Sequence, residues 1–149
     1  MISPTPITLS FVDFGFHLFK LQALLEQYVR HIVDQFGLTI TDTKVLMILG
    51  YSPGVHFSYL EKEVPATDVD IAQTLVKLRK IGVIRKEKKG HTRFPTYYLT
   101  ESGSELNTLI MEQLNAEVET MLDKAEPGQL LTTTQLVNRL HARLQEEEY

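Results

Sequence analysis

The chain has 149 residues and no cysteine, which excludes disulfides, thiolate metal sites, cysteine nucleophiles and thiol-based redox sensing. Its hydrophobic content of 43% and charged content of 23% are those of an ordinary globular domain, and no apolar run approaches the roughly 20 residues that span a membrane. The N-terminal segment lacks the basic flank and apolar stretch of a signal peptide, so a cytoplasmic protein without membrane contact is expected.

The formal net charge of -4 is unevenly distributed along the sequence. Eight of the 15 Lys and Arg residues fall between Lys77 and Arg93, where Glu87 is the only acid, so this stretch carries a charge of +7. The rest of the chain carries -11. This asymmetry indicates one basic element on an acidic body and favours phosphate contact by several of these cations.

Two helices are predicted in the first third of the chain. Between residues 11 and 35, apolar residues recur at spacings of three and four, the signature of an amphipathic helix that ends at Phe36 and Gly37. A second helix is predicted to start with Thr41 as its N-cap and to end at the breakers in residues 52–54. The apolar stripes comprise Leu18, Leu21, Leu25, Tyr28 and Ile32 in the first helix and Val45, Leu46, Ile48 and Leu49 in the second.

A short helix, a turn and a longer helix are predicted next. Residues 58–64 form the short helix, and Pro65 forces a turn because proline disfavours a helical conformation at the residue before it. Thr67 and Asp70 have the spacing of a capping box, in which each side chain bonds the backbone N–H of the other residue. The helix that follows is predicted to bury Ile71, Leu75 and Leu78, to present Asp70, Gln73, Thr74 and Lys77 on its outer side, and to end at Gly82.

A β-hairpin and two further helices complete the prediction. Residues 83–87 and 94–99 are predicted to be strands around the polar tip 88–93, with Pro95 where only an edge or twisted strand tolerates it. Thr100 caps a long helix from residue 101 to about 124, which the segment 126–128 interrupts. The last helix is predicted over about residues 133–146.

The predicted fold is mainly α with a small β-hairpin wing, a winged helix-turn-helix in a single domain over residues 1–149. Its long N- and C-terminal helices carry more apolar surface than a core of this size needs, so a second copy is expected to cover it. The phenylalanines near the N-terminus are interpreted as dimer packing, with the lining of a ligand pocket as the alternative. The predicted dimerisation residues are Phe11, Phe14, Leu18, Leu21, Leu136, Leu140 and Leu144.

Four short segments between residues 38 and 103 carry a family resemblance. They are Leu38-Thr39, Ser52-Pro53-Gly54-Val55, Leu78 with Gly82-Val83-Ile84-Arg85, and Leu99-Thr100-Glu101-Ser102-Gly103. By their order and spacing the chain resembles the MarR family of bacterial regulators. It departs from the family pattern in the wing, where only Arg93 matches a minor-groove arginine, in Asp68 and Asp70 of the recognition helix, and in Glu61 and Pro65 before it.

The resemblance implies a homodimer joined through helices in residues 11–37 and 104–146, around a DNA-binding core at 38–103. The helix over residues 68–81 would enter the major groove, the wing would reach the adjacent minor groove, and a small-molecule effector would bind between the dimer and DNA-binding regions. The partners are then double-stranded DNA and a second copy of the chain. The DNA contacts predicted are Thr67, Asp70, Gln73, Thr74, Lys77, Lys86, Lys88, Lys89, His91, Thr92 and Arg93.

Two interpretations of function follow. The first is a dimeric, sequence-specific DNA-binding transcriptional regulator, a repressor relieved by a small ligand. The alternative is a winged-helix module that docks another protein and binds DNA weakly or not at all, which Asp68 and Asp70 favour because carboxylates oppose phosphate contact. The same acids also suit a first helical turn on structural grounds. No metal-ligand spacing of histidines and no catalytic motif is present, so no metal, cofactor or enzyme activity is expected.

Overall fold

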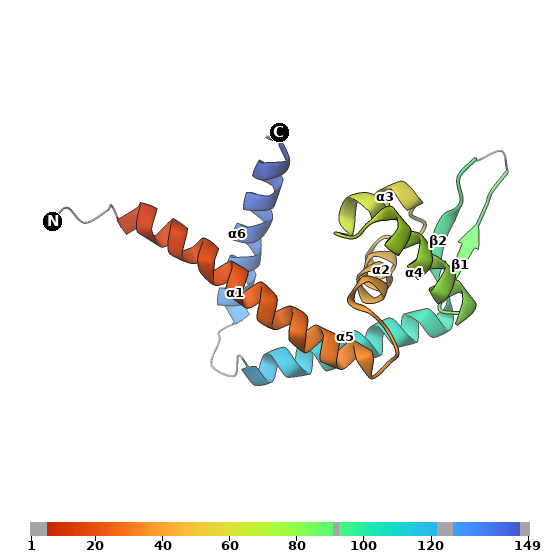
Figure 1. The fold of residues 1–149 in the computed structure, drawn as a ribbon, viewed down its shortest axis with the longest axis horizontal. Helices are drawn as coiled ribbons and strands as arrows, with labels where there is room; N and C mark the ends of the chain where they lie inside the picture. Colours follow the sequence, from red (N-terminus) through yellow and green to blue (C-terminus); the bar gives the residue numbers. More distant parts are fainter. Residues whose placement is uncertain (1–5, 91–92, 122–126, 147–149) are drawn as a thin grey trace. The chain divides into compact units, whose positions relative to one another are not determined.

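The computed structural model describes residues 6–90, 93–121 and 127–146. Within these ranges the chain forms six α-helices and one two-stranded antiparallel sheet, which confirms the predicted fold of a mainly helical protein with a hairpin wing. The elements, in chain order, are α1 (Pro6–Asp34), α2 (Ile40–Tyr51), α3 (Phe57–Glu63), α4 (Asp68–Lys80), β1 (Ile84–Glu87), β2 (Thr96–Leu99), α5 (Glu101–Met121) and α6 (Pro127–Glu146) (Figure 1).

Two compact units make up the chain, residues 1–114 and 115–149. The first contains α1 to α4, the hairpin and the greater part of α5, and the second contains the end of α5 and all of α6. The interpretation as a single domain stays a prediction.

The core of the first unit forms around α2, which packs against α1, α4 and β2. It is apolar and includes residues from α1, α2, α3, α4 and α5, so the helix-turn-helix and the start of α5 share one core. Its largest fully buried apolar side chains are Leu46, Leu49, Leu60, Ile71, Leu78 and Ile110.

Several helix boundaries differ from the prediction. The N-cap of α2 is Thr39, two residues before the predicted Thr41, because Thr39 and Asp42 form a reciprocal capping box: each backbone N–H donates to the other's side-chain oxygen, at 2.9 and 3.0 Å. Helices α1 and α6 begin at Pro6 and Pro127, several residues earlier than predicted. Proline fits a first helical position because the N–H that it lacks would have no partner there.

At the start of α4 the predicted capping box is half formed. The backbone N–H of Asp70 donates to Thr67 Oγ1 at 3.1 Å, whereas among the described contacts no bond returns from the Asp70 carboxylate. The end of α4 is as predicted: Gly82 has a φ of 82°, and the N–H groups of Gly82 and Val83 donate to the carbonyls of Arg79 and Leu78. This is the Schellman pattern, in which glycine supplies the left-handed residue after the helix.

The start of α5 is fixed to this turn after α4. The hydroxyls of Thr100 and Ser102 both donate to the carbonyl of Gly82, at 2.7 and 3.0 Å, and Thr100 also accepts from the N–H of Gly103, as its predicted role as a cap requires. Gly103 lies so close to the turn that a Cβ there would stand 1.8 Å from the Val83 carbonyl oxygen. Glycine at this position therefore lets α5 and the end of α4 meet.

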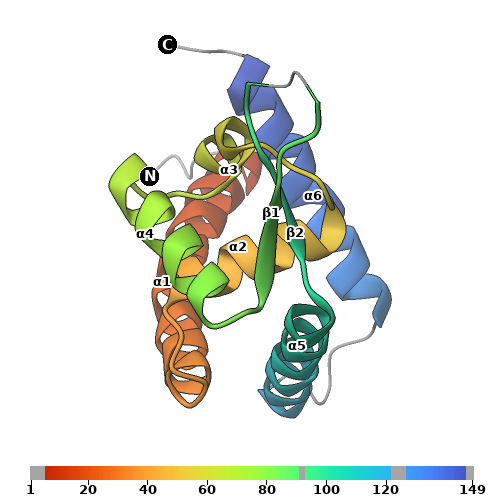
Figure 2. The ribbon, with the colours of Figure 1, turned by 90° about the vertical axis from the view of Figure 1, so that its right-hand side faces the viewer.

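Strands β1 and β2 pair with Ile84 opposite Leu99, and Figure 2 shows the two strands side by side. Both strands are shorter than predicted. Strand β2 starts only after Pro95, which cannot donate a ladder hydrogen bond. On its other edge Tyr97 forms a bridge to Val55, so β2 is held on both sides.

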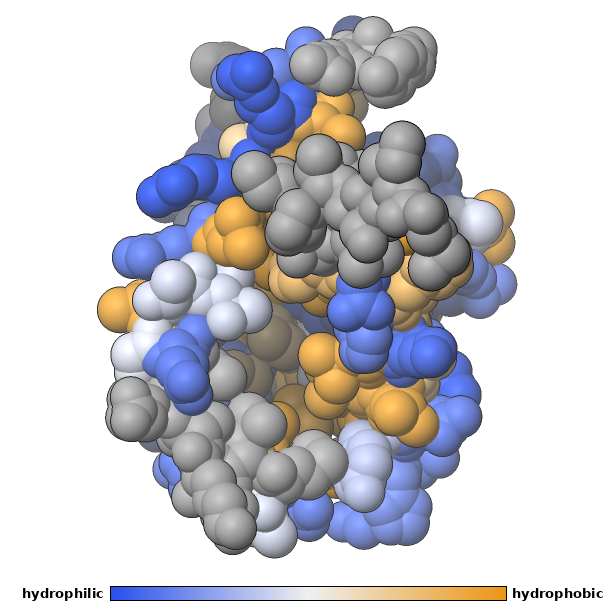
Figure 3. Space-filling view, turned by 90° about the vertical axis from the view of Figure 1, so that its left-hand side faces the viewer, coloured by the Kyte–Doolittle hydropathy of each residue, from blue (hydrophilic) through white to orange (hydrophobic). Residues whose placement is uncertain are grey.

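Apolar side chains remain exposed along α1, including Phe16, Phe19 and Leu24. In Figure 3 apolar residues, in orange, lie among polar ones on the surface of the face that is viewed. Exposed apolar residues of this kind give α1 a surface that can pack against another protein surface.

Candidate nucleic-acid interface

Helix α4 has one buried and one exposed face. Ile71, Leu75 and Leu78 are buried as predicted. Gln73 is exposed as predicted, in the middle of an outer face that also carries Val69, Ala72 and Val76.

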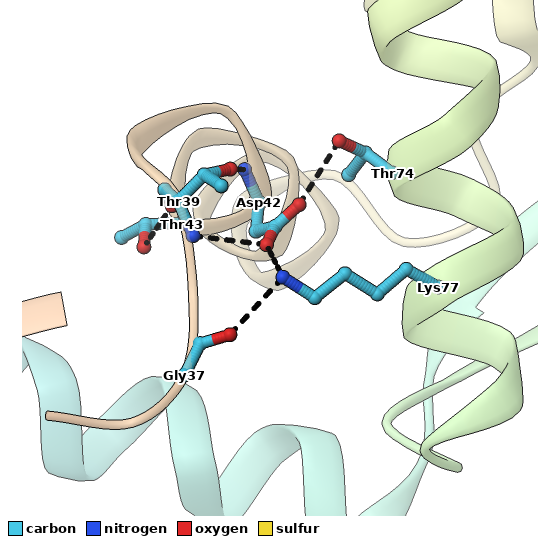
Figure 4. A network of polar contacts seen from close by, with 6 residues as sticks. All are labelled: Gly37, Thr39, Asp42, Thr43, Thr74 and Lys77. Carbon is cyan, nitrogen blue, oxygen red and sulfur yellow. Dashed lines mark hydrogen bonds and ion pairs between the residues drawn. The ribbon is translucent and has the colours of Figure 1, made fainter. Parts of the chain in front are cut away.

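Two residues predicted for the outer side of α4 point toward Asp42 of α2 (Figure 4). Thr74 is buried and donates to Asp42 Oδ1 at 3.0 Å, so its predicted exposure is wrong. The ammonium group of Lys77 lies 2.6 Å from Asp42 Oδ2 and 3.0 Å from the carbonyl oxygen of Gly37. Both side chains connect α4 to α2, and Lys77 also contacts the turn before it. The Lys77 side chain nevertheless stays 41% exposed.

Asp42 is the centre of this network, and it was not among the predicted functional residues. Burial by itself would raise the pKa of this carboxyl, but hydrogen bonds from Lys77, from the N–H of Thr39 and from Thr74 outweigh it, so the pKa of Asp42 is lowered. The carboxylate stays ionised and holds α4 against α2. The sequence contained one signal for Asp42: it stands three residues after Thr39, which is the spacing of a capping box.

A groove of about 610 Å³ runs between the second half of α4 and strand β1. Four of its lining side chains are cationic, and of these only Lys86 was among the predicted DNA contacts. The others belong to the basic stretch, but a charge count could not show that α4 and β1 bring them together. The lining residues are Val76, Arg79, Lys80, Ile84, Arg85 and Lys86.

The wing continues this basic surface. Lys86, Lys88, Lys89 and Arg93 are exposed, as their predicted role requires, whereas His91 and Thr92 lie outside the described residues. Glu87 neutralises part of the wing, because it pairs with Arg85 and lies 4.0 Å from the ammonium of Lys89.

The guanidinium of Arg85 also lies over the ring of Tyr98, 4.3 Å from its centroid. Within the described part of the basic stretch, five cations have no acidic partner and are available to an anion. They are Arg79, Lys80, Lys86, Lys88 and Arg93.

The start of α4 is acidic. Thr67, Asp68 and Asp70 are all exposed, so the predicted contacts Thr67 and Asp70 can be reached from solvent. Slight burial and the neighbouring carboxyl of Asp68 raise the pKa of Glu61 at the end of α3. This end of the helix therefore repels phosphate, while the end of the helix beside β1 attracts it.

A pocket of about 250 Å³ lies between α2 and α5 within the first unit. The side-chain oxygen of Asn107 is buried without a hydrogen-bond partner among the described residues. Such an acceptor is available to a ligand donor. The pocket is lined by Met47, Gly50, Tyr51, Leu99, Ser104, Asn107, Thr108 and Met111.

No protein-family model and no curated protein matches the sequence. Solved structures do match. The MarR family transcriptional regulator AbsC from Streptomyces coelicolor has a TM-score of 0.74 at 20% identity, over 98% of this chain and 99% of that one. The chain has the MarR fold.

Two further structures with this MarR fold contain small molecules. NadR in complex with 4-hydroxyphenylacetate has a TM-score of 0.75 at 19% identity, over 85% of this chain and 91% of its own. A MarR family protein of Mycobacterium tuberculosis in complex with p-aminosalicylic acid has a TM-score of 0.69 at 22% identity, over 85% and 97% of the two chains.

In this MarR-fold chain the predicted dimerisation residues are largely open to solvent. Leu18 and Leu21 on α1, and Leu136 and Leu144 on α6, are exposed, while Phe14 and Leu140 are half-buried. The side chain of Phe11 lies outside the described part of the structure. Each of the two helices thus retains apolar surface that the described chain does not cover.

Across the described ranges no helix is both long and apolar enough to cross a membrane. The same ranges contain no group of three His, Asp or Glu side chains placed to hold a metal ion.

Proposed function

We propose that the chain is a transcription regulator that binds duplex DNA through α4 and the β1–β2 wing. The observation that carries this proposal is the groove beside α4, which is lined by the cations Arg79, Lys80, Arg85 and Lys86. This basic groove stands out because the whole chain has a net charge of -4. The outer face of α4 lies next to these cations and offers side chains to base edges. The description of the solved neighbours as transcription regulators adds support.

Two surfaces have different roles in the proposed DNA binding. Cations in the groove and the wing contact phosphates, which position the protein without reading sequence. The exposed face of α4, with Gln73 at its centre, contacts base edges in the major groove. Thr74 and Lys77 take no part, since Thr74 is buried and the ammonium group of Lys77 is paired with Asp42.

The test is the salt dependence of binding to a random-sequence duplex, measured by fluorescence anisotropy between about 50 and 200 mM salt. The slope of log affinity against log salt falls by about 0.9 for each phosphate contact removed. Lys86→Gln should therefore lower the slope, whereas Lys20→Gln, which removes the same charge from exposed α1, should leave it unchanged. Equal slopes for both variants would contradict the placement of the interface.

We further propose that the chain acts as a homodimer, because α1 and α6 expose large apolar residues such as Phe19 and Leu144. Sedimentation at micromolar concentration should give twice the chain mass of 17.1 kDa. Phe19→Glu should shift the protein towards the monomer, since a buried carboxylate without a partner opposes association. A wild-type monomer would contradict this proposal, because two recognition helices one DNA turn apart require a partner.

The pocket between α2 and α5 is the proposed effector site. It offers hydroxyl groups of Tyr51, Ser104 and Thr108 and the unpartnered oxygen of Asn107 to a small polar ligand. Aromatic acids are the first candidates, since two proteins of the same fold are solved with them. We propose that such a ligand lowers DNA affinity and so relieves repression.

Thermal-shift titrations with 4-hydroxyphenylacetate and p-aminosalicylic acid test this site. A ligand that binds only the folded protein raises its melting temperature with concentration. Asn107→Leu should abolish the shift, while Gln22→Leu on exposed α1 should keep it. A shift that survives Asn107→Leu would place the ligand elsewhere.

The second candidate function is a protein-docking module. The carboxylates Glu61, Asp68 and Asp70 around the start of α4 favour it, because they repel DNA at one end of the recognition helix. The salt titration separates the two candidates: a wild-type protein without salt-dependent DNA binding would make the docking module the better interpretation.

A further inference from the structure

The outer face of α4 is unusually apolar for a water-facing helix in a charged region. Val69 and Val76 are each 64% exposed, and Ala72 lies between them on the same face. Valine is a weaker helix former than Leu, Lys or Glu, so two exposed valines give the helix neither propensity nor burial. This face therefore has its use in a contact with another molecule.

Charge identifies that molecule. Val76 is part of the wall of the groove that holds Arg79, Lys80, Arg85 and Lys86, so a partner that reaches Val76 also meets the three of these cations that Glu87 does not pair. A polyanion with small apolar groups on its surface fits both features. Duplex DNA has them in its major groove, where every thymine presents a C5-methyl group.

We infer that Val69 and Val76 read thymine methyl groups, so that the chain recognises half-sites rich in A·T pairs. The inference rests on the proposed DNA-binding function. The two valines are seven residues apart, which is about two turns and 10.5 Å along a helix, so they lie on one face of α4. Between them Gln73 can form two hydrogen bonds with an adenine edge, which also selects an A·T pair.

The experiment begins with selection of bound duplexes from a random library by the full-length protein. The enriched duplex is then remade with deoxyuridine in place of thymidine, one position at a time, which removes a single methyl group and leaves base pairing intact. At two different positions in each half-site, uracil should weaken binding about fourfold per methyl group, the factor expected for one buried methylene-sized group.

The valine variants assign each methyl group to a side chain. Val69→Ala should become insensitive to uracil at one of the two positions and Val76→Ala at the other, because each variant already lacks the contact. Val12→Ala, an exposed valine on α1, should keep the full sensitivity of the wild type.

An enriched duplex without thymine at such positions, or one that binds equally well with uracil, would overturn the inference and leave DNA binding itself intact. A protein that enriches no duplex at all would instead overturn the proposed function, and with it this inference.

Discussion

Replacing Asp42 should destabilise the protein more than its place in the first turn of a helix suggests. Its carboxylate accepts hydrogen bonds from the Thr39 N–H, Thr74 and Lys77, at 2.9, 3.0 and 2.6 Å. A hydrogen bond to a charged group contributes about 1.5–3 kcal/mol, and breaking a buried ion pair costs about 3–5 kcal/mol. Because the Lys77 side chain is 41% exposed, we expect the low end of that range, about 3 kcal/mol for Asp42→Ala.

The assay is equilibrium urea unfolding at fixed protein concentration, with thermal melts alongside. Asp42→Asn retains the shape and one cap acceptor, so it should lose about 2 kcal/mol, while Asp34→Asn removes an exposed carboxylate from α1 and should lose nothing measurable. A double-mutant cycle of Asp42→Asn with Lys77→Met should give a coupling of about 1 kcal/mol. If Asp42→Asn unfolded within about 0.5 kcal/mol of the wild type, the network would not hold α4 against α2.

The contribution of the Asp42 carboxylate to stability should also depend on pH in the acid range. The pKa of Asp42 is lowered in the folded protein from its ordinary value of 3.8, because its hydrogen bonds outweigh its burial. The stability that it contributes is therefore fully present above the ordinary value and is lost as the pH falls through the lower folded pKa. In pH-dependent melts Asp42→Asn should lack this part of the acid destabilisation.

Two further variants test the fold and the interface. Gly103→Ala puts a Cβ 1.8 Å from the Val83 carbonyl oxygen and should lower the free energy of unfolding in urea by at least about 2 kcal/mol. Gly128→Ala is the control, because its Cβ meets nothing within 4 Å, and it should leave this free energy unchanged. Equal stabilities of the two variants would refute the close contact of α5 with the turn. Replacing Asp68 and Asp70 with Asn should tighten binding to random duplex DNA and keep the salt slope similar or steeper, with helix stability changed by about 1 kcal/mol or less. A double variant that binds no better than its parent would indicate that the start of α4 does not face DNA.

The sequence alone determined the features that depend on residues close together in the chain, such as helix order, caps and turns. The spacing of apolar residues predicted the helix order, and the turn at Gly82 and the cap at Thr100 were found where expected because both are short-range backbone features. The concentration of cations near the hairpin was equally visible, since charge is a property of composition. The helix start at Pro127 was missed because the segment 126–128 was interpreted only as an interruption, and the start at Pro6 because the apolar spacing was followed only from residue 11.

Only the tertiary structure decided which polar side chains of α4 remain available. Thr74 and Lys77 have the composition of an outer face, yet both are engaged by Asp42, which lies 32 and 35 residues away in the sequence. The periodicity of one helix predicts on which side of the helix a residue lies. It does not predict which charged group of another element, such as Asp42, that side chain meets. For the same physical reason the basic groove, and the valines beside it, became visible only when α4 and β1 were placed together.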